Sequence, residues 1–371
     1  MTSCTRPGPR DEPARRPFRP LPPPCLSGHE EPVAAWLRGQ LSELGFSSRT
    51  DRLGNLILTL PGDDDRPSVM VFAHMDQLGF FVRKVEPDGL IRVERMGGVA
   101  EKAMLAQAVL LCPPGHDPVP GVIMVKAHHA TQPSEKYTVP TAPEIRIDTG
   151  HGSREAVEAA GIRIGTPVIY LPRVLPLAND RFAGTAVDDR AGCAVLLDVA
   201  RRLKDRQGGP TVHFVWSVQE EFNLRGAVVA AQTLKPDIAI QLDLMLATDT
   251  PDMAERGEMV MGGGPGMSLY SFHGRGTLNG VIPHPALVRL IEDTAESEGM
   301  PLQRSAQVGV LTDLSYVQTV GEGIASIDLG FPMRHSHSAL EVCDLRDLES
   351  LSRLLVAALD RIGPNLRLER G

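Results

Sequence analysis

The sequence lacks the features of several protein classes. No apolar run approaches the roughly 18 residues that a membrane-spanning helix requires. The five cysteines are odd in number and scattered, and no CxxC spacing occurs, which argues against a disulfide framework and against a thiolate zinc site. Positive charge is not in excess, because the net charge is -8 and the pI is near 5.8. We therefore expect neither nucleic acid nor a membrane as the main partner.

The amino-terminal segment lacks the apolar core that a secretory signal peptide requires. Residues 1–26 are instead rich in Arg and Pro, so we expect a disordered tail, with a short linear binding motif as the minority interpretation. Scattered cysteines without a disulfide pattern suit a reducing compartment. A cytoplasmic location is therefore the prediction.

What the sequence does contain is enough for a complete enzyme core. Its 371 residues allow more than one domain, and 42% hydrophobic and 23% charged residues are ordinary for a soluble globular protein. Residues 27–86 begin with helical apolar spacing, with Ser27 as a candidate N-cap and Glu30 as its capping-box partner, and continue with strand patterns. Residues 177–371 alternate strands with helices, which indicates a largely parallel, helix-covered sheet.

Residues 87–176, between these two segments, have a different character. Short β segments broken by Gly and Pro predominate there, and they indicate a small β-barrel rather than more of the α/β sheet. We therefore predict an α/β fold with a mixed, largely parallel sheet covered by helices. One discontinuous catalytic domain, residues 27–86 and 177–371, is interrupted by an inserted β domain, residues 87–176.

Two adjacent glutamates, Glu220 and Glu221, follow the apolar run TVHFVWSV, which is typical of a buried strand. Carboxylates at such a place need a partner, which can be a metal, a proton or a cation. Neighbouring side chains on an extended chain point to opposite sides. The pattern therefore predicts that one glutamate binds a metal while the other handles a proton.

Other candidate residues also lie at or after predicted strands. His74 and Asp76 are two residues apart, so their side chains project from one face, and an Asp beside a His suits a metal-ligating imidazole. Asp243 ends an apolar strand, where open α/β sheets place their sites. Each candidate has a plain alternative when taken alone, since Asp188 can compensate a helix dipole and His337 can be a surface histidine.

The candidates carry more weight together than singly. Five separate segments deliver two imidazoles and three carboxylates: His74, Asp188, Glu221, Asp243 and His337. Such ligands without thiolate suit Zn²⁺, Co²⁺ or Mn²⁺ in a hydrolytic site. Three carboxylates and one bridging hydroxide would balance the charge of two divalent ions. Two metal ions therefore fit this set better than one.

Five segments closely resemble the signature motifs of the tetrahedral aminopeptidases, also called the glutamyl aminopeptidase family and, in older labelling, "endoglucanase". They are AHMDQLGF, AVDDRAGC, QEEFNLRGA, PDIAIQLD and RHSHSALE, and they occur in the family's order and at its spacing. A further segment, IRIDTGHGSREAVEAAGIRIGTPVIY, resembles the end of that family's inserted dimerisation domain. The likeness runs from about Ser27 to Ile362.

The resemblance implies a zinc-exopeptidase-like fold with two divalent metal ions per subunit, Zn²⁺ or Co²⁺, with Mn²⁺ as a further option. By motif, the metal ligands would be His74 and Asp243 for one ion, Glu221 and His337 for the other, and Asp188 for both. Asp76 would orient His74, and Glu220 would be the general base. The family also implies dimers formed through the inserted domain, assembled into a hollow tetrahedral dodecamer with its sites facing the interior.

Two residues depart from the family pattern. Asn223 stands where members usually have Gly, and Asn tolerates a left-handed backbone. His335 stands where Tyr is usual, which places a second histidine two residues before His337. We assign the ligand role to His337 because it aligns with the histidine of the motif.

The resulting hypothesis is a metal-dependent aminopeptidase that removes N-terminal residues from short peptides, with Glu220 taking a proton from a metal-activated water. One alternative is a metal-dependent deacylase or amidohydrolase that acts on N-acyl amino acids or peptides. Another is a catalytically silent assembly protein. A glycosidase, as the older label suggests, would need two carboxylates and no metal, and it would leave His74, Asp188 and His337 unexplained.

Overall fold

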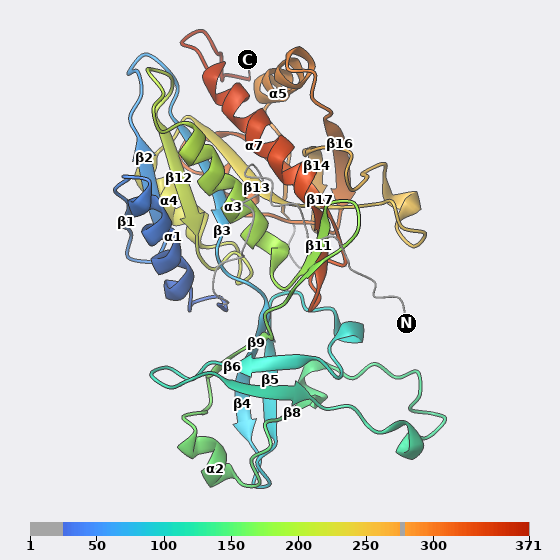
Figure 1. The fold of residues 1–371 in the computed structure, drawn as a ribbon. Coiled ribbons are helices and arrows are strands. Elements are labelled where there is room, and N and C mark those ends of the chain that lie inside the picture. Colours follow the sequence, from blue (N-terminus) through green and yellow to red (C-terminus); the bar gives the residue numbers. More distant parts are fainter. Residues whose placement is uncertain (1–24, 275–278, 371) are drawn as a thin grey trace, which may run out of the picture.

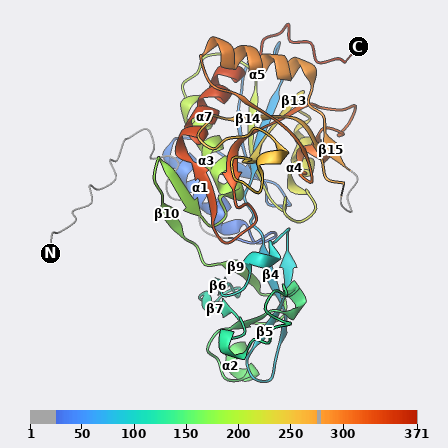
Figure 2. The ribbon, with the colours of Figure 1, turned by 90° about the vertical axis from the view of Figure 1, so that its right-hand side faces the viewer.

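The computed structural model describes residues 25–274 and 279–370. This part of the chain divides into a helix-covered sheet and, below it in Figures 1 and 2, a small barrel. The fold class is as predicted, a mixed α/β sheet with an inserted β-barrel. The tail expected for residues 1–26 lies outside the described residues, except for Cys25 and Leu26, which are buried.

Twelve strands of the described residues form one mixed sheet (Figure 1). The central strands β12, β3, β13 and β17 are parallel, so their carboxyl ends meet at one edge of the sheet. The main path runs through β1 (Arg49–Thr50), β2 (Leu56–Leu60), β12 (Val212–Ser217), β3 (Val69–His74), β13 (Ile238–Leu246), β17 (Ala325–Arg334), β18 (Glu341–Asp344), β11 (Arg181–Gly184) and β10 (Val174–Pro176). Off this path lie β14 (Gly266–Phe272), β15 (Gly280–Val281) and β16 (Gln303–Val308).

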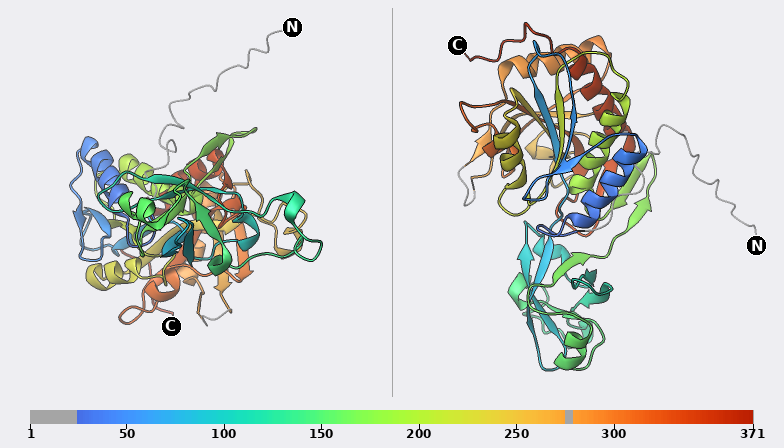
Figure 3. Two further views of the ribbon diagram at one scale, coloured as in Figure 1. Left: turned by 90° about the horizontal axis from the view of Figure 1, so that it is seen from below. Right: turned by 90° about the vertical axis from the view of Figure 1, so that its left-hand side faces the viewer.

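Alternate side chains of the central strands enter two separate cores, one on each face of the sheet. Val69 and Val71 of β3 contribute to the core that is covered by α1 (Glu31–Glu43), α3 (Val187–Arg202), α5 (Pro285–Ser297) and α7 (Leu345–Asp360). Met70 and Phe72 contribute to the other core, which is covered by α4 (Gly226–Leu234) and α6 (Leu314–Val317). The right-hand view of Figure 3 shows α1, α3 and α7, in blue, green and red, on the same side of the strands. Burial on both faces explains the continuous apolar runs in the sequence.

The barrel has its own apolar interior, to which Val82, Val93 and Val109 contribute. Its strands close in the order β4 (Gly79–Val85), β5 (Ile91–Met96), β8 (Arg146–Asp148), β7 (Val119–Ile123), β6 (Ala108–Leu111) and β9 (Pro167–Tyr170). The helix α2 (Arg154–Ala159) belongs to this part of the chain. Because β4 begins shortly after β3 ends, the barrel lies beside the edge where the central strands terminate. Among the described residues, no helix combines the length and apolarity needed to cross a bilayer.

The start of α1 differs from the expectation of a capping box. Glu30, not Ser27, occupies the N-cap position, and no side chain caps the helix there. Ser27 Oγ instead donates a hydrogen bond to Asp76 Oδ2 at 2.6 Å, and Glu30 Oε1 accepts one from the Gln219 backbone N–H at 3.0 Å. The predicted capping box is therefore wrong, because both side chains are buried and take partners from distant segments near the strand ends.

Candidate active site

The carboxyl ends of the central strands open into a cavity of about 590 Å³. Predicted site residues line it: His74, Asp188, Glu220, Glu221, Asp243 and His337. Asp76 is fully buried behind them. Within the described residues, the lining contains no lysine or arginine. The acidic side chains therefore face one another with histidine as their basic neighbour.

Strand ends deliver these side chains to the cavity. His74 is the last residue of β3, and Asp243 lies in the second half of β13. Glu220 and Glu221 follow the end of β12, His337 follows β17, and Asp188 lies in the first turn of α3. The segments from β3, β12, β13 and β17 are far apart in the sequence and meet because these four strands are neighbours in the sheet.

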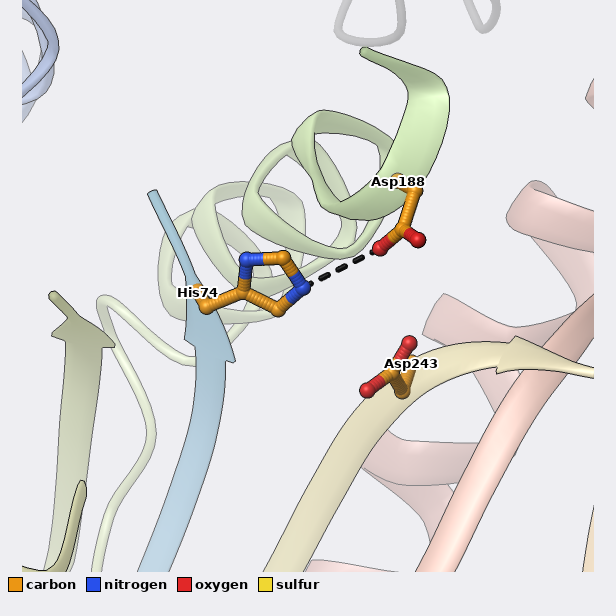
Figure 4. Close-up of side chains that lie close together, drawn as sticks. All are labelled: His74, Asp188 and Asp243. Carbon is orange, nitrogen blue, oxygen red and sulfur yellow. Dashed lines mark hydrogen bonds and ion pairs between the residues drawn. The ribbon is translucent and has the colours of Figure 1, made fainter. Parts of the chain in front are cut away.

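Asp188 lies between the two histidines. Its Oδ1 is 3.0 Å from Nε2 of His74, and its Oδ2 is 3.3 Å from Nε2 of His337. Figure 4 shows that the carboxyl groups of Asp188 and Asp243 point into the same space beside the His74 ring. Burial opposes ionisation of Asp188, but the hydrogen bonds with His337 and His74 outweigh burial and lower its pKa. Asp188 therefore presents one carboxylate oxygen to each histidine.

The side chains form two groups that are compact enough to hold a metal ion. The first consists of His74, Asp188 and Asp243, and the second of Asp188, Glu221 and His337. In each group the candidate ligand atoms all lie within 4.8 Å of one another. Both groups combine imidazole and carboxylate donors, and they share Asp188, as a pair of neighbouring ions would require.

The carboxyl groups of the cavity have only histidines as basic partners, because no lysine or arginine of the described residues lines it. Burial raises the pKa of Glu221 to about 7 and that of Asp243 to about 7, and the nearby Asp188 contributes to both shifts. Burial also raises the pKa of Glu220 well above its usual value, and Glu221 and Asp243 add repulsion. The buried Oε1 of Glu221 has no hydrogen-bond partner. Such a set of donors fits divalent cations, which would supply the missing positive charge.

Asp76 ties two strand ends together. Its Oδ1 accepts a hydrogen bond from the Glu220 backbone N–H at 3.0 Å, and its Oδ2 accepts one from the Glu221 backbone N–H at 3.1 Å. The Nδ1 of His74 is 3.1 Å from the carbonyl oxygen of Asp76 and 3.5 Å from Oδ1. Burial opposes ionisation of Asp76, but hydrogen bonds from His74 and Ser27 outweigh it and lower its pKa. Asp76 thus fixes both the His74 ring and the backbone of the two glutamates.

Sequence reasoning missed two residues that support the ligands. Glu341 is buried; its Oε2 accepts a hydrogen bond from the Asp188 backbone N–H at 3.0 Å, and its Oε1 accepts one from the His337 backbone N–H at 2.7 Å. Gln241 is also buried, and its Nε2 donates to Asp243 Oδ2 at 3.1 Å. The available signals were weak: Glu341 falls inside the motif RHSHSALE, and Gln241 is the polar residue of an apolar strand.

The structure shows where the two residues that depart from the family pattern, Asn223 and His335, lie. Asn223 has φ 65°, so it adopts the left-handed backbone that asparagine tolerates. His337 lines the cavity, whereas His335, two residues earlier, is not part of the lining.

Comparison with known proteins gives a consistent result. Residues 54–354 match the model of the M42 glutamyl aminopeptidase family. The chain is 40% identical over 335 residues to SgcX of Escherichia coli, which is named as a candidate aminopeptidase, covering 90% of this chain and 89% of that protein. It is 31% identical over 345 residues to a lysyl aminopeptidase of Pyrococcus furiosus, covering 92% and 95%. The solved aminopeptidase APDkam598 of Desulfurococcus kamchatkensis superimposes with a TM-score of 0.89 at 31% identity, covering 96% of this chain and 98% of that one.

Proposed function

The chain belongs to the M42 glutamyl aminopeptidase family and is thus an aminopeptidase, and we propose that it removes N-terminal residues from short peptides with two divalent metal ions. The observation that carries this proposal is the convergence of two histidines and three carboxylates on one cavity that no lysine or arginine of the described residues lines. Hydrolysis of a peptide bond requires a polarised carbonyl, an activated water and a proton for the leaving amine.

Five residues would hold the two ions. His74 and Asp243 would hold one, Glu221 and His337 the other, and Asp188 would contact both. Imidazole and carboxylate donors without thiolate suit Zn²⁺ or Co²⁺, and Mn²⁺ is also compatible. When bound, such ions supply Lewis acidity, which polarises a carbonyl and lowers the pKa of water.

Glu220 is proposed as the group that moves the proton. It is buried at the cavity, with its Oε2 3.9 Å from His74 Nε2, and its raised pKa favours a carboxyl group that can accept a proton and later release it. Glu220 takes the proton of the attacking water and delivers it to the leaving amine. Asp76 keeps the His74 ring and the backbone of Glu220 in place.

The test compares substrates and one variant. The metal-loaded protein should hydrolyse aminoacyl-p-nitroanilides and should not hydrolyse their N-acetylated forms, because an aminopeptidase requires a free α-amine. Glu220→Gln should retain the metal content of the unmodified protein, measured by elemental analysis, and lose about 10²- to 10⁴-fold in turnover. Preference for N-acetylated substrates would favour the deacylase alternative. Absence of both bound metal and hydrolysis would favour a silent assembly protein.

We also propose an oligomer in which residues 87–176 form the assembly domain and residues 27–86 with 177–371 the catalytic domain. The barrel segment exposes large apolar side chains, which is typical of a surface that another subunit covers: Val122, Met124, Val125, Tyr137 and Val139. A dimer as the building block of a tetrahedral dodecamer follows from the family resemblance, and light scattering would measure it. The described cysteines Cys25, Cys112, Cys193 and Cys343 are free, which supports a cytoplasmic location.

A further inference from the structure

A second, smaller cavity lies against the main one. Its volume is about 20 Å³, and a water-sized group needs roughly 10–15 Å³. The two cavities share lining residues, namely Asp243, Leu244, Leu246, Val310 and Thr312. A side chain that extends from the main cavity past this shared wall would therefore place its terminal group in the small cavity.

The small cavity contains an acidic group that the proposed mechanism does not use. Asp328 is 3% exposed; its Oδ1 accepts a hydrogen bond from Thr312 Oγ1 at 3.1 Å, whereas its Oδ2 has no partner. Ser271 lines the same cavity, is 4% exposed, and its Oγ also has no partner. Among the described residues that line this cavity, none is Lys, Arg or His. Buried polar groups of this kind are costly unless a ligand completes them.

The register between β13 and β17 sets the distance of Asp328 from Asp243. Asp328 of β17 pairs with Gln241 of β13, two residues before Asp243. Diagonal neighbours on adjacent strands are about 7 Å apart, so Asp328 lies roughly one long side chain away from Asp243. The shared wall between them is largely apolar, since Leu244, Leu246 and Val310 contribute to it. The arrangement matches a side chain with an apolar stem and a polar, cationic end.

We propose that the two cavities together bind the N-terminal side chain of the substrate and that Asp328 selects a cationic one, lysine above all. This selectivity rests on the proposed aminopeptidase function. Lysine carries a compact ammonium with three donors on a flexible four-carbon stem. The stem contacts Leu244 and Leu246, and the ammonium donates hydrogen bonds to Asp328 Oδ2 and Ser271 Oγ. A glutamyl side chain finds no cationic partner there, because none of the described lining residues is Lys, Arg or His, and a leucyl side chain fills the apolar part alone.

The first experiment measures kcat/KM of the metal-loaded, full-length protein for a panel of p-nitroanilides. The panel contains Lys, Arg, Leu, Glu and ε-N-acetyl-Lys, which keeps the stem of lysine and removes its charge. We expect Lys to be the best substrate, Leu to be intermediate and Glu to be the poorest. The acetylated lysine should lose at least about tenfold relative to Lys.

The second experiment uses variants of the small cavity. Asp328→Asn should lower kcat/KM for Lys at least about tenfold while that for Leu changes less than about threefold. Ser271→Ala should lower the Lys value by a smaller factor. Asp293→Asn, an exposed change on α5, is the matched control and should leave the whole panel unchanged. The Leu substrate also reports whether each variant is folded.

The outcomes separate this selectivity from the proposed function. Good hydrolysis of Leu with poor hydrolysis of Lys would overturn the selectivity and leave the aminopeptidase function intact. An equal loss for Lys and Leu in Asp328→Asn would also overturn it, because Asp328 would then have only a structural role. If no substrate with a free amine were hydrolysed, the proposed function would fail, and the selectivity with it.

Discussion

The two groups of candidate metal ligands share Asp188 but are built differently. In the first group, His74 and Asp243 belong to strands and are buried. In the second, Glu221 and His337 lie in segments that follow strands, and the His337 side chain is 37% exposed. A central strand is held by a neighbour on each side, whereas a connecting segment needs hydrogen bonds of its own. The buried group is thus positioned by the sheet, and the second, partly buried group by added contacts.

The residues that support the ligands follow this division in part. Gln241 of β13 bridges Asp243 and the Leu314 backbone N–H, which donates to its Oε1 at 2.6 Å. Glu341 holds the backbone of both Asp188 and His337, and Asp76 holds the backbone of Glu221. The neutral amide of Gln241 therefore supports the buried group alone, whereas the carboxylates of Glu341 and Asp76 contact residues of both groups. Changing these residues one at a time tests whether the groups act separately.

The largest effect is expected for Asp188→Asn, because this residue belongs to both groups. The amide keeps one uncharged oxygen and its nitrogen is a poor ligand, so one group loses its donor and the other keeps a weaker, neutral one. We expect metal content to fall for both sites and turnover to fall more than about 10³-fold, since losing one charge-stabilising donor alone costs about 10²- to 10³-fold. Elemental analysis together with hydrolysis of aminoacyl-p-nitroanilides measures this. Retention of both ions with unchanged affinity would contradict a shared ligand.

An intermediate effect is expected from the supporting residues. Loss of such a partner costs about 10- to 100-fold in metal affinity. Gln241→Leu should weaken one of two binding steps, because Gln241 contacts Asp243 alone among the ligands. Glu341→Gln should weaken both steps, because a glutamine amide has one acceptor oxygen for the two N–H groups of Asp188 and His337.

Calorimetric titration of metal into the metal-free variants separates these two results. The control is Glu349→Gln, a surface change on α7 that contacts none of the ligands named here and should leave both steps unaltered. If Gln241→Leu weakened both steps equally, the two groups would act as one unit, and the contrast between sheet and connecting segments would fail.

The sequence predicts those parts of the molecule that depend on local patterns. Apolar runs with polar ends located the central strands and placed Glu220 and Glu221 just after β12, whereas Asp243, expected at a strand end, lies in the second half of β13, which continues to Leu246. Motif order completed the set of candidate ligands. Parallel pairing brings segments that are far apart in the chain to one edge of the sheet. A correct prediction of the fold class therefore also predicts that most of the candidate ligands lie close together.

The parts that escaped prediction depend on partners from distant segments. Ser27 and Glu30 form a regular capping pattern, yet the structure gives them Asp76 and Gln219 as partners. Burial near the strand ends outweighs a local cap, because a buried polar group must find a hydrogen bond wherever one is available. Asp328 was not predicted for a related reason. Only the folded structure shows that its Oδ2 has no hydrogen-bond partner and that the residue lines a cavity.

The smallest expected effect concerns pH and the metal-free protein. Burial raises the pKa of Glu221 and of Asp243 to about 7, from usual values of 4.5 and 3.8. A carboxyl group whose pKa is raised on folding binds its proton more tightly in the folded state, so its stabilising contribution is lost as the pH rises through that pKa. The raised pKa values of His74 and His337 act in the same direction. We therefore expect the Tm of chelator-treated protein to fall by a few degrees from about pH 5.5 to about pH 8.

The metal-loaded protein is the control for this measurement. Bound cations stabilise the charged carboxylates and require deprotonated ligands, so its Tm should depend less on pH and should exceed that of the metal-free protein most clearly at the higher pH. Thermal unfolding of both forms across the pH range measures the difference. A Tm of the metal-free protein that rises between about pH 5.5 and about pH 8 would show that the carboxylates of both ligand groups are charged without the ions, and that their repulsion is relieved within the protein itself.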